Sequence, residues 1–191
     1  MAAPLQALLN IESGGFHLVG TTGVGKTTIL KVMASVLGIK DLPQWRSTTN
    51  GLESVAHAHN NMALPMDEIG QADPREVGLI AYMLANGQGK TRMNKNLTNR
   101  KAKTWQLLFL SSGEMGMGAY MALAGIVQKG GQEVRMPDIP AACTGSQYGA
   151  FENIHGCSTS KRICRKPGCG DQVVSWHTDR CIFRAVGNRC S

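Results

Sequence analysis

A glycine-rich octapeptide near the start of the chain narrows the possible folds more than any other segment, because it fits the pattern G-x-x-x-x-G-K-[S/T]. Its residues are Gly20, Thr21, Thr22, Gly23, Val24, Gly25, Lys26 and Thr27, and Thr28 follows them. Glycines in such a loop permit backbone angles that a Cβ would forbid, so successive N–H groups can turn inward around an anion. A helix that begins at the loop adds the positive end of its dipole. The pattern therefore predicts a loop that cradles phosphates.

The flanking sequence supports this interpretation over a glycine turn that matches by chance. Residues 15–19 form a short apolar run typical of a buried strand. Apolar residues then recur at helical spacing until Gly38, namely Ile29, Leu30, Met33, Val36 and Leu37. In such a loop the lysine, here Lys26, reaches the β and γ oxygens and the hydroxyl of Thr27 ligates Mg²⁺. The expected ligands are ATP and Mg²⁺, with residues 20–28 as the binding segment.

A second strand carries two adjacent carboxylates. Residues 62–66 are apolar and end at Asp67 and Glu68. In a nucleotide-hydrolysing site Asp67 would hold the Mg²⁺ shell, and Glu68 would polarise the attacking water. The alternative is a solvated acidic pair at a strand end. Pro65 lacks a backbone donor and is disfavoured in a central strand, so it is expected to interrupt this one.

The middle of the chain contains a helix, a basic segment and a third strand. Asp73-Pro74 starts the helix, which ends at Asn86-Gly87. Residues 89–103 contain basic side chains and no acid, which predicts a β-hairpin with a basic tip; a solvated face is the alternative. The candidate nucleic-acid contacts there are Lys90, Arg92, Lys95 and Arg100. Residues 105–110 form the third apolar strand, and Ser111 and Ser112 are expected to cap its carboxyl end.

Composition limits the class of protein. A chain of 191 residues has room for one α/β domain with its own core, and no apolar run is long enough to span a membrane. The apolar N-terminal segment lacks the basic region of a secretory signal. We therefore expect a cytoplasmic protein that does not contact a membrane.

Longer motifs surround these features, at residues 12–18, 50–53, 67–71, 82–90, 108–114 and 131–135. Together they resemble an uncharacterised ATPase domain of putative DNA primase/helicase proteins from phages, plasmids and mobile cassettes. Cassette-chromosome helicases carry this domain, and it has MCM-like AAA+ relatives. The resemblance covers roughly residues 5–156. It implies an α/β P-loop NTPase core of the AAA+ kind, with a mainly parallel sheet, flanking helices and an inserted β-hairpin.

The resemblance also implies roles for single residues. Ser111 or Ser112 would occupy the sensor-1 position beside the γ-phosphate, and Ser111 is our candidate. The basic hairpin would enter a DNA channel, with Lys95 near its tip. Arg135 would act as an arginine finger on the nucleotide of a neighbouring subunit in a homo-oligomeric ring.

The last part of the chain departs from the resemblance. Residues 157–191 carry seven Lys/Arg against two Asp, and five of the six cysteines. The spacing Cys164-x4-Cys169-x7-His177-x3-Cys181 lacks the paired C-x₂-C of a zinc ribbon, and a disulfide framework does not suit a cytoplasmic ATPase. The alternatives left open are a zinc site, a basic nucleic-acid-binding extension and a disordered tail translated outside the reading frame of the family. We therefore divide the chain into a core at 1–156, truncated on its N-terminal side, and a tail at 157–191.

These observations favour an ATP-dependent DNA helicase or translocase core of mobile-element replication that contacts DNA through its backbone. One alternative is a nucleotide-binding regulatory or assembly module without translocation. Another is an inactive truncated fragment.

Overall fold

Four parallel strands form the central sheet of the computed structural model, in the order β2-β5-β1-β6. The structure describes residues 3–90, 92–93, 99–100 and 102–153. The strands of the sheet are β1 (Gly14–Val19), β2 (Ala63–Met66), β5 (Leu108–Gly113) and β6 (Asp138–Pro140). A separate antiparallel pair consists of β3 (Arg92–Met93) and β4 (Asn99–Arg100).

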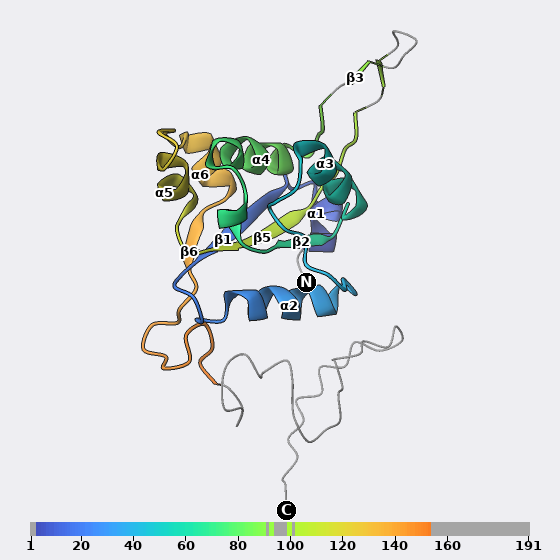
Figure 1. Cartoon of the computed structure of the whole chain (residues 1–191). Helices are drawn as coiled ribbons and strands as arrows, with labels where there is room; N and C mark the ends of the chain where they lie inside the picture. Colours follow the sequence, from blue (N-terminus) through green and yellow to red (C-terminus); the bar gives the residue numbers. More distant parts are fainter. Residues whose placement is uncertain (1–2, 91, 94–98, 101, 154–191) are drawn as a thin grey trace, which may run out of the picture.

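Helices cover both faces of this sheet (Figure 1). They are α1 (Ala3–Leu9), α2 (Lys26–Val36), α3 (Thr49–Ala58), α4 (Pro74–Asn86), α5 (Met117–Ala122) and α6 (Gly130–Arg135), with a 3₁₀ turn η1 (Ile69–Gln71). Helix α2 lies against β2 and β5 on one face, and α4 lies on the other face together with α3, α5 and α6. The main apolar cluster fills the space between the sheet and the α4 layer; its largest fully buried members include Trp45, Phe109, Leu64, Met66, Ile80 and Leu84.

The register brings three strand ends to one edge of the sheet. β5 lies between β1 and β2, with Val19 opposite Gly113 and Met66 opposite Ser111. The glycine loop follows β1, and the acid pair follows β2. In open parallel sheets ligands bind beyond this carboxyl edge, so the fold brings together the two motifs that the sequence predicted to share one ligand.

The expected α/β fold is confirmed as a four-stranded parallel sheet flanked by helices, and the hairpin is present as β3 and β4. Helix α4 begins and ends where its capping residues predict. The Asp73 carboxylate accepts a hydrogen bond from the Arg75 N–H at 2.9 Å, and Gly87 ends the helix in the left-handed conformation.

Pro65 does not interrupt its strand, contrary to the expectation. The Leu108 N–H donates to the Met62 carbonyl at 3.4 Å. In a parallel ladder successive residues bond to opposite sides, so Met62 faces β5 and Pro65 faces the other way. Within the described sheet β2 is an edge strand, and a proline nitrogen is tolerated at an edge.

The third strand begins and ends three residues later than expected. Residues 105–107 are apolar or amide-bearing, but their N–H groups bond to the Gly87 carbonyl and to the side chains of Asn60 and Ser13. These bonds divert the backbone from the sheet until Leu108. Ser111 and Ser112 therefore lie inside β5 and do not cap its end.

Lys95, the boundary at 156 and the tail at 157–191 lie outside the described residues. Within the described ranges, none of the helices has the length and apolar character needed to cross a bilayer.

Candidate active site

The glycine loop turns through two positions that only glycine adopts easily. Gly23 has φ 91° and Gly25 has φ 106°, both in the left-handed region, and α2 begins directly after Gly25. Its N-cap residue is Gly25, which has no side chain to bond to the first N–H groups of the helix. The first N–H groups of a helix have no partner within the helix, so these donors and the positive helix end make this loop suited to an anion.

Lys26 is held inside the loop. Its side chain is 7% exposed, and Nζ donates to the carbonyls of Gly20 at 2.6 Å and Thr21 at 3.0 Å. A lysine on these carbonyls needs only a rotation of its flexible stem to reach an anion in the loop.

A turn near the end of the described chain packs against the same loop. The Ala150 N–H donates to the Val24 carbonyl at 2.8 Å. A Cβ at Gly25 would lie 2.6 Å from the Phe151 ring. Gly25 is therefore required both by its backbone angle and by this close approach.

The two predicted Mg²⁺ ligands come together. The Thr27 hydroxyl lies 3.3 Å from Asp67 Oδ1, although 40 residues separate them. Hydroxyl and carboxylate oxygens suit Mg²⁺, which commonly takes its other ligands from phosphates and water. No group of three or more His, Cys, Asp or Glu among the described residues is arranged to hold a metal.

Glu68 adopts a strained backbone beside Asp67. Its φ is 55°, a conformation that costs a non-glycine residue about 1–3 kcal/mol. Two bonds hold it: its N–H donates to Ser112 Oγ at 3.1 Å, and its carboxylate accepts from the Gly70 N–H at 3.3 Å. Strain of this kind concentrates at functional sites.

Ser112, and not Ser111, contacts the acid pair. Ser112 Oγ donates to Asp67 Oδ1 at 2.7 Å. Ser111 is fully buried and bonds to His17 and Trp45 at 2.9 Å each. Neighbouring residues of a strand point to opposite faces, so Ser112 faces Asp67 while Ser111 faces His17 and Trp45.

The basic hairpin lies at the opposite edge of the sheet, because its second strand leads into the start of β5 (Figure 1). Helix α3 anchors its base: the Lys90 N–H donates to the Glu53 carboxylate at 3.1 Å, and Lys103 Nζ donates to Ser54 Oγ at 2.9 Å. Lys90 is exposed, and Arg92 pairs in register with Arg100. The candidate nucleic-acid residues and the glycine loop are thus separated by the length of β5.

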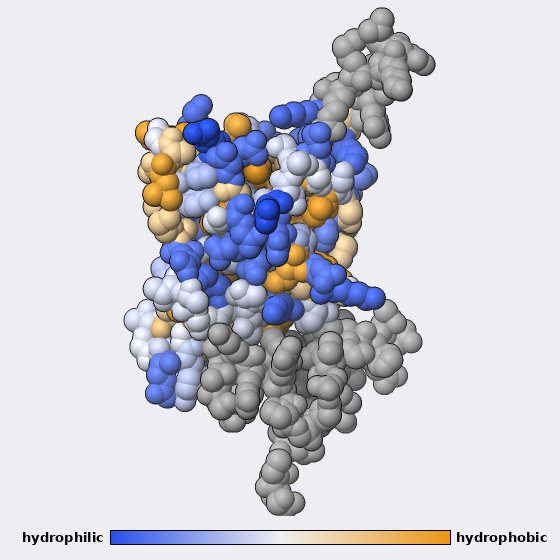
Figure 2. All heavy atoms as spheres, in the orientation of Figure 1, coloured by the Kyte–Doolittle hydropathy of each residue, from blue (hydrophilic) through white to orange (hydrophobic). Residues whose placement is uncertain are grey.

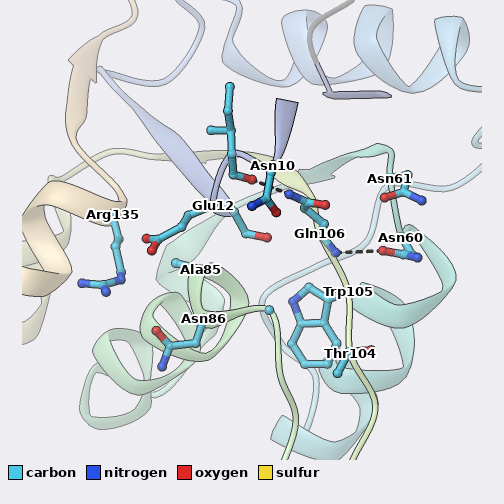
Figure 3. A pocket seen from close by; sticks show the side chains of 13 residues that line it. Asn10, Glu12, Asn60, Asn61, Ala85, Asn86, Thr104, Trp105, Gln106 and Arg135 are labelled. Carbon is cyan, nitrogen blue, oxygen red and sulfur yellow. Dashed lines mark hydrogen bonds between the residues drawn. The ribbon is translucent and has the colours of Figure 1, made fainter. Parts of the chain in front are cut away.

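Arg135 also lies at the edge remote from the loop. It lines an open, mainly polar pocket of about 680 Å³, shown in Figure 3 together with Glu12, Asn86 and Gln106. Its Nη1 donates to the Gly131 carbonyl at 3.0 Å, and the guanidinium carbon lies 4.8 Å from the centre of the Tyr82 ring. Arg135 therefore lies far from the glycine loop of its own chain.

The sheet and the polar residues at its carboxyl edge define an α/β protein whose fold resembles that of a helicase. A solved structure described as "SCCmec type IV Cch - active helicase" is similar at TM-score 0.58 and 21% identity, over 83% of this chain and 27% of that chain. The present chain thus spans about a quarter of that protein. The family model "Domain of unknown function (DUF927)" matches residues 1–104, and the chain belongs to this family. Among curated proteins, none matches the chain.

Two residues near the glycine loop were not predicted as site residues from the sequence. Glu114 follows β5 directly, and its carboxylate accepts a hydrogen bond from the Thr22 hydroxyl. Its place after an apolar strand, like that of Asp67, is a signal that could have identified it. His17 gave only a weak signal, since one histidine in an apolar run is commonly a core residue.

Proposed function

We propose that the chain is the MgATP-hydrolysing core of a DNA helicase or translocase of mobile-element replication, built as an AAA+-like P-loop NTPase. The observation that carries this proposal is the approach of Thr27 to Asp67 at 3.3 Å beside the buried Lys26. A triphosphate chelating Mg²⁺ needs these three groups in one place. The likeness of the fold to a helicase agrees with this assignment.

Each residue then has a defined task. Residues 20–28 bind the phosphates, and Lys26 neutralises charge on the β and γ oxygens. Thr27 and Asp67 would hold Mg²⁺, with Ser112 fixing the Asp67 carboxylate. Glu68 would accept the proton of the attacking water. Bound MgATP supplies the phosphoryl group that is transferred to water.

Nucleic acid would be held by the basic hairpin, mainly through its phosphates. Lys90, Arg92, Lys95 and Arg100 are the residues proposed to bind them. Arg135 would complete the nucleotide site of an adjacent subunit in a homo-oligomeric ring, because it lies away from its own loop.

A nucleotide-binding regulatory module without translocation is the second candidate. One observation favours it: the Glu68 carboxylate is engaged with the Gly70 N–H and so is partly withdrawn from the site. DNA-stimulated ATP hydrolysis separates the two, because only a translocase couples turnover to DNA. Turnover that DNA leaves unchanged would favour the regulatory module.

Calorimetric titration of MgATP into Lys26→Ala protein tests the binding site itself. Removal of a charge-assisted hydrogen bond to phosphate, worth about 1.5–3 kcal/mol, should weaken binding roughly tenfold to a hundredfold. Lys31→Ala is the matched control, since Lys31 is exposed on the same helix. Equal affinity of the wild-type and Lys26→Ala proteins would remove the basis of the proposal.

A further inference from the structure

His17, in β1, bonds through its two ring nitrogens to β5 and to the segment that follows β5. It lies in β1, three residues before Gly20, and is fully buried. Nδ1 is 2.9 Å from Ser111 Oγ, and Nε2 is 3.0 Å from the Met115 carbonyl. None of these atoms belongs to the proposed catalytic groups.

The partners fix the direction of each bond. The Met115 carbonyl can only accept, so Nε2 carries the hydrogen and Nδ1 accepts from the Ser111 hydroxyl. Ser111 Oγ in turn accepts from the indole N–H of Trp45 at 2.9 Å. The result is a buried relay, Trp45 to Ser111 to His17 to Met115, in which the imidazole is neutral and every polar atom is paired.

The relay holds the immediate neighbours of the residues that reach the site. Ser111 precedes Ser112, which bonds to the Asp67 carboxylate. Met115 follows Glu114, whose carboxylate bonds to Thr22 in the glycine loop. A shift of either held residue would therefore move Ser112 or Glu114 relative to the loop.

The segment that contains Trp45, at the other end of the relay, is also bonded to Asp67. Trp45 follows Gln44, which pairs in parallel with Asp67. The Asp67 N–H donates to the Pro43 carbonyl at 3.0 Å. The segment that carries Trp45 therefore also positions the first residue of the acid pair.

We propose that His17 is a positioning residue of the phosphate site: as a neutral imidazole it sets, through Ser111 and Met115, where Ser112 and Glu114 lie relative to the glycine loop. This inference rests on the proposed function for its consequence in catalysis, but the relay itself can be tested without nucleotide. A histidine that only stabilises the core would affect folding and leave turnover per folded molecule unchanged.

Charge on His17 is incompatible with the relay. A proton on Nδ1 would make Ser111 accept two bonds and leave the Ser111 hydrogen without an acceptor. Burial lowers the pKa of His17 and Lys26 lowers it further, whereas the Met115 carbonyl, Asp138 and Glu68 oppose the shift. The unfolded chain therefore takes up this proton near pH 6.5 and the folded chain only at lower pH. Its contribution to stability is complete above about pH 6.5 and is lost as the pH falls below it.

Nitrogen-15 NMR of the ring of His17 provides the test that needs no nucleotide. The expected result is a neutral Nε2–H tautomer that persists below pH 6.5. The Ser111→Ala variant should change the ratio of the two neutral tautomers of His17, or the pH at which its ring takes up a proton. Protonation near pH 6.5, or an Nδ1–H tautomer in the wild-type protein, would overturn the relay.

Steady-state hydrolysis and nucleotide binding test the positioning role in the full chain. Ser111→Ala and His17→Leu should lower kcat at least about tenfold while MgATP affinity stays within about threefold. His17→Asn keeps an acceptor near the Nδ1 position, so it should recover a substantial share of the kcat that His17→Leu removes. Phe109→Leu is the control, since it perturbs a buried side chain of β5 outside the relay.

The outcomes separate the two proposals. Unchanged kcat in Ser111→Ala and His17→Leu, or reductions that match Phe109→Leu at equal thermal stability, would overturn the positioning role. Failure of wild-type protein to bind MgATP would instead overturn the proposed function, and the NMR experiment would still decide the relay.

Discussion

Single residues at the carboxyl edge of the sheet show where the site departs from ordinary backbone geometry. Glu68 is held at φ 55° by Ser112 and by its own bond to Gly70. Gly25 is required by a left-handed angle and by the Phe151 ring. Glu68 adopts its angle at a conformational cost, whereas a glycine adopts the angle of Gly25 without one.

Replacing Glu68 with glutamine separates binding from turnover. The amide oxygen can still accept from the Gly70 N–H, so the backbone and MgATP affinity should be retained. A carboxamide cannot act as a base, and loss of general-base catalysis should lower kcat about 10²–10⁴-fold. Glu76→Gln, an exposed change of the same charge on α4, is the control for hydrolysis assays. Full turnover in Glu68→Gln would identify Glu68 as a simple cap of the 3₁₀ turn.

Among the elements, β5 connects the two proposed functional regions. Its N-terminal end follows the hairpin, its C-terminal part carries Ser112, and Glu114 comes directly after it. Six residues at about 3.3 Å each separate these ends by roughly 20 Å. Any coupling between the hairpin and the acid pair would therefore act over this distance and not through direct contact.

Removing hairpin charge should weaken DNA binding in a salt-dependent manner. The hairpin segment contains no aromatic residue before Trp105, so base stacking cannot supply the main interaction. Lys95→Ala or Lys90→Ala should reduce the slope of log K against log salt by about 0.7–0.9 for each DNA phosphate that the variant no longer neutralises. Titrations at several salt concentrations measure this slope, with Lys40→Ala as an exposed lysine control away from the hairpin. MgATP affinity should not change. An unaltered slope in both hairpin variants would indicate that the basic residues of the hairpin only form a solvated surface and do not bind DNA.

For the molecule as a whole, several large apolar side chains are exposed at the α5–α6 end. Leu123, Val127 and Val134 are 67%, 85% and 81% exposed. Figure 2 shows hydrophobic surface along the side of the molecule where α5 lies in Figure 1. Exposed apolar surface of this kind is typical of interaction sites, and Arg135 ends α6 at the same end of the fold.

Mixing two inactive variants tests whether Arg135 acts between subunits. If it does, hydrolysis by Arg135→Ala and by Lys26→Ala protein should each be low, and mixtures should recover part of the activity. Recovery is expected because some interfaces then pair an intact loop with an intact arginine. Adding the Lys26→Ala/Arg135→Ala double variant to Arg135→Ala protein is the control, since no such interface can form. Absence of recovery at every ratio, in samples shown to be oligomeric, would exclude the role in trans.

Local patterns in the sequence were sufficient to predict much of the fold and of the candidate site. The glycine loop, the start of α2 and the capped ends of α4 depend on residues within a few positions of one another, so hydrogen bonds of short range determine them. The placement of Asp67 and Glu68 after a buried strand followed in the same way. These local patterns therefore identified the groups that could bind a phosphate and its metal ion.

Tertiary structure alone decided how those groups are aligned. Which of two adjacent serines faces Asp67 depends on the register of β5 against β1 and β2, and a shift of one residue would exchange them. Pro65 is harmless only because β2 lies at the edge of the described sheet with that nitrogen turned outward. The relay from Trp45 to Met115 joins residues up to 98 positions apart. Strand pairing and buried hydrogen bonds between such distant residues are set by the packed fold, and no local pattern in the sequence encodes them.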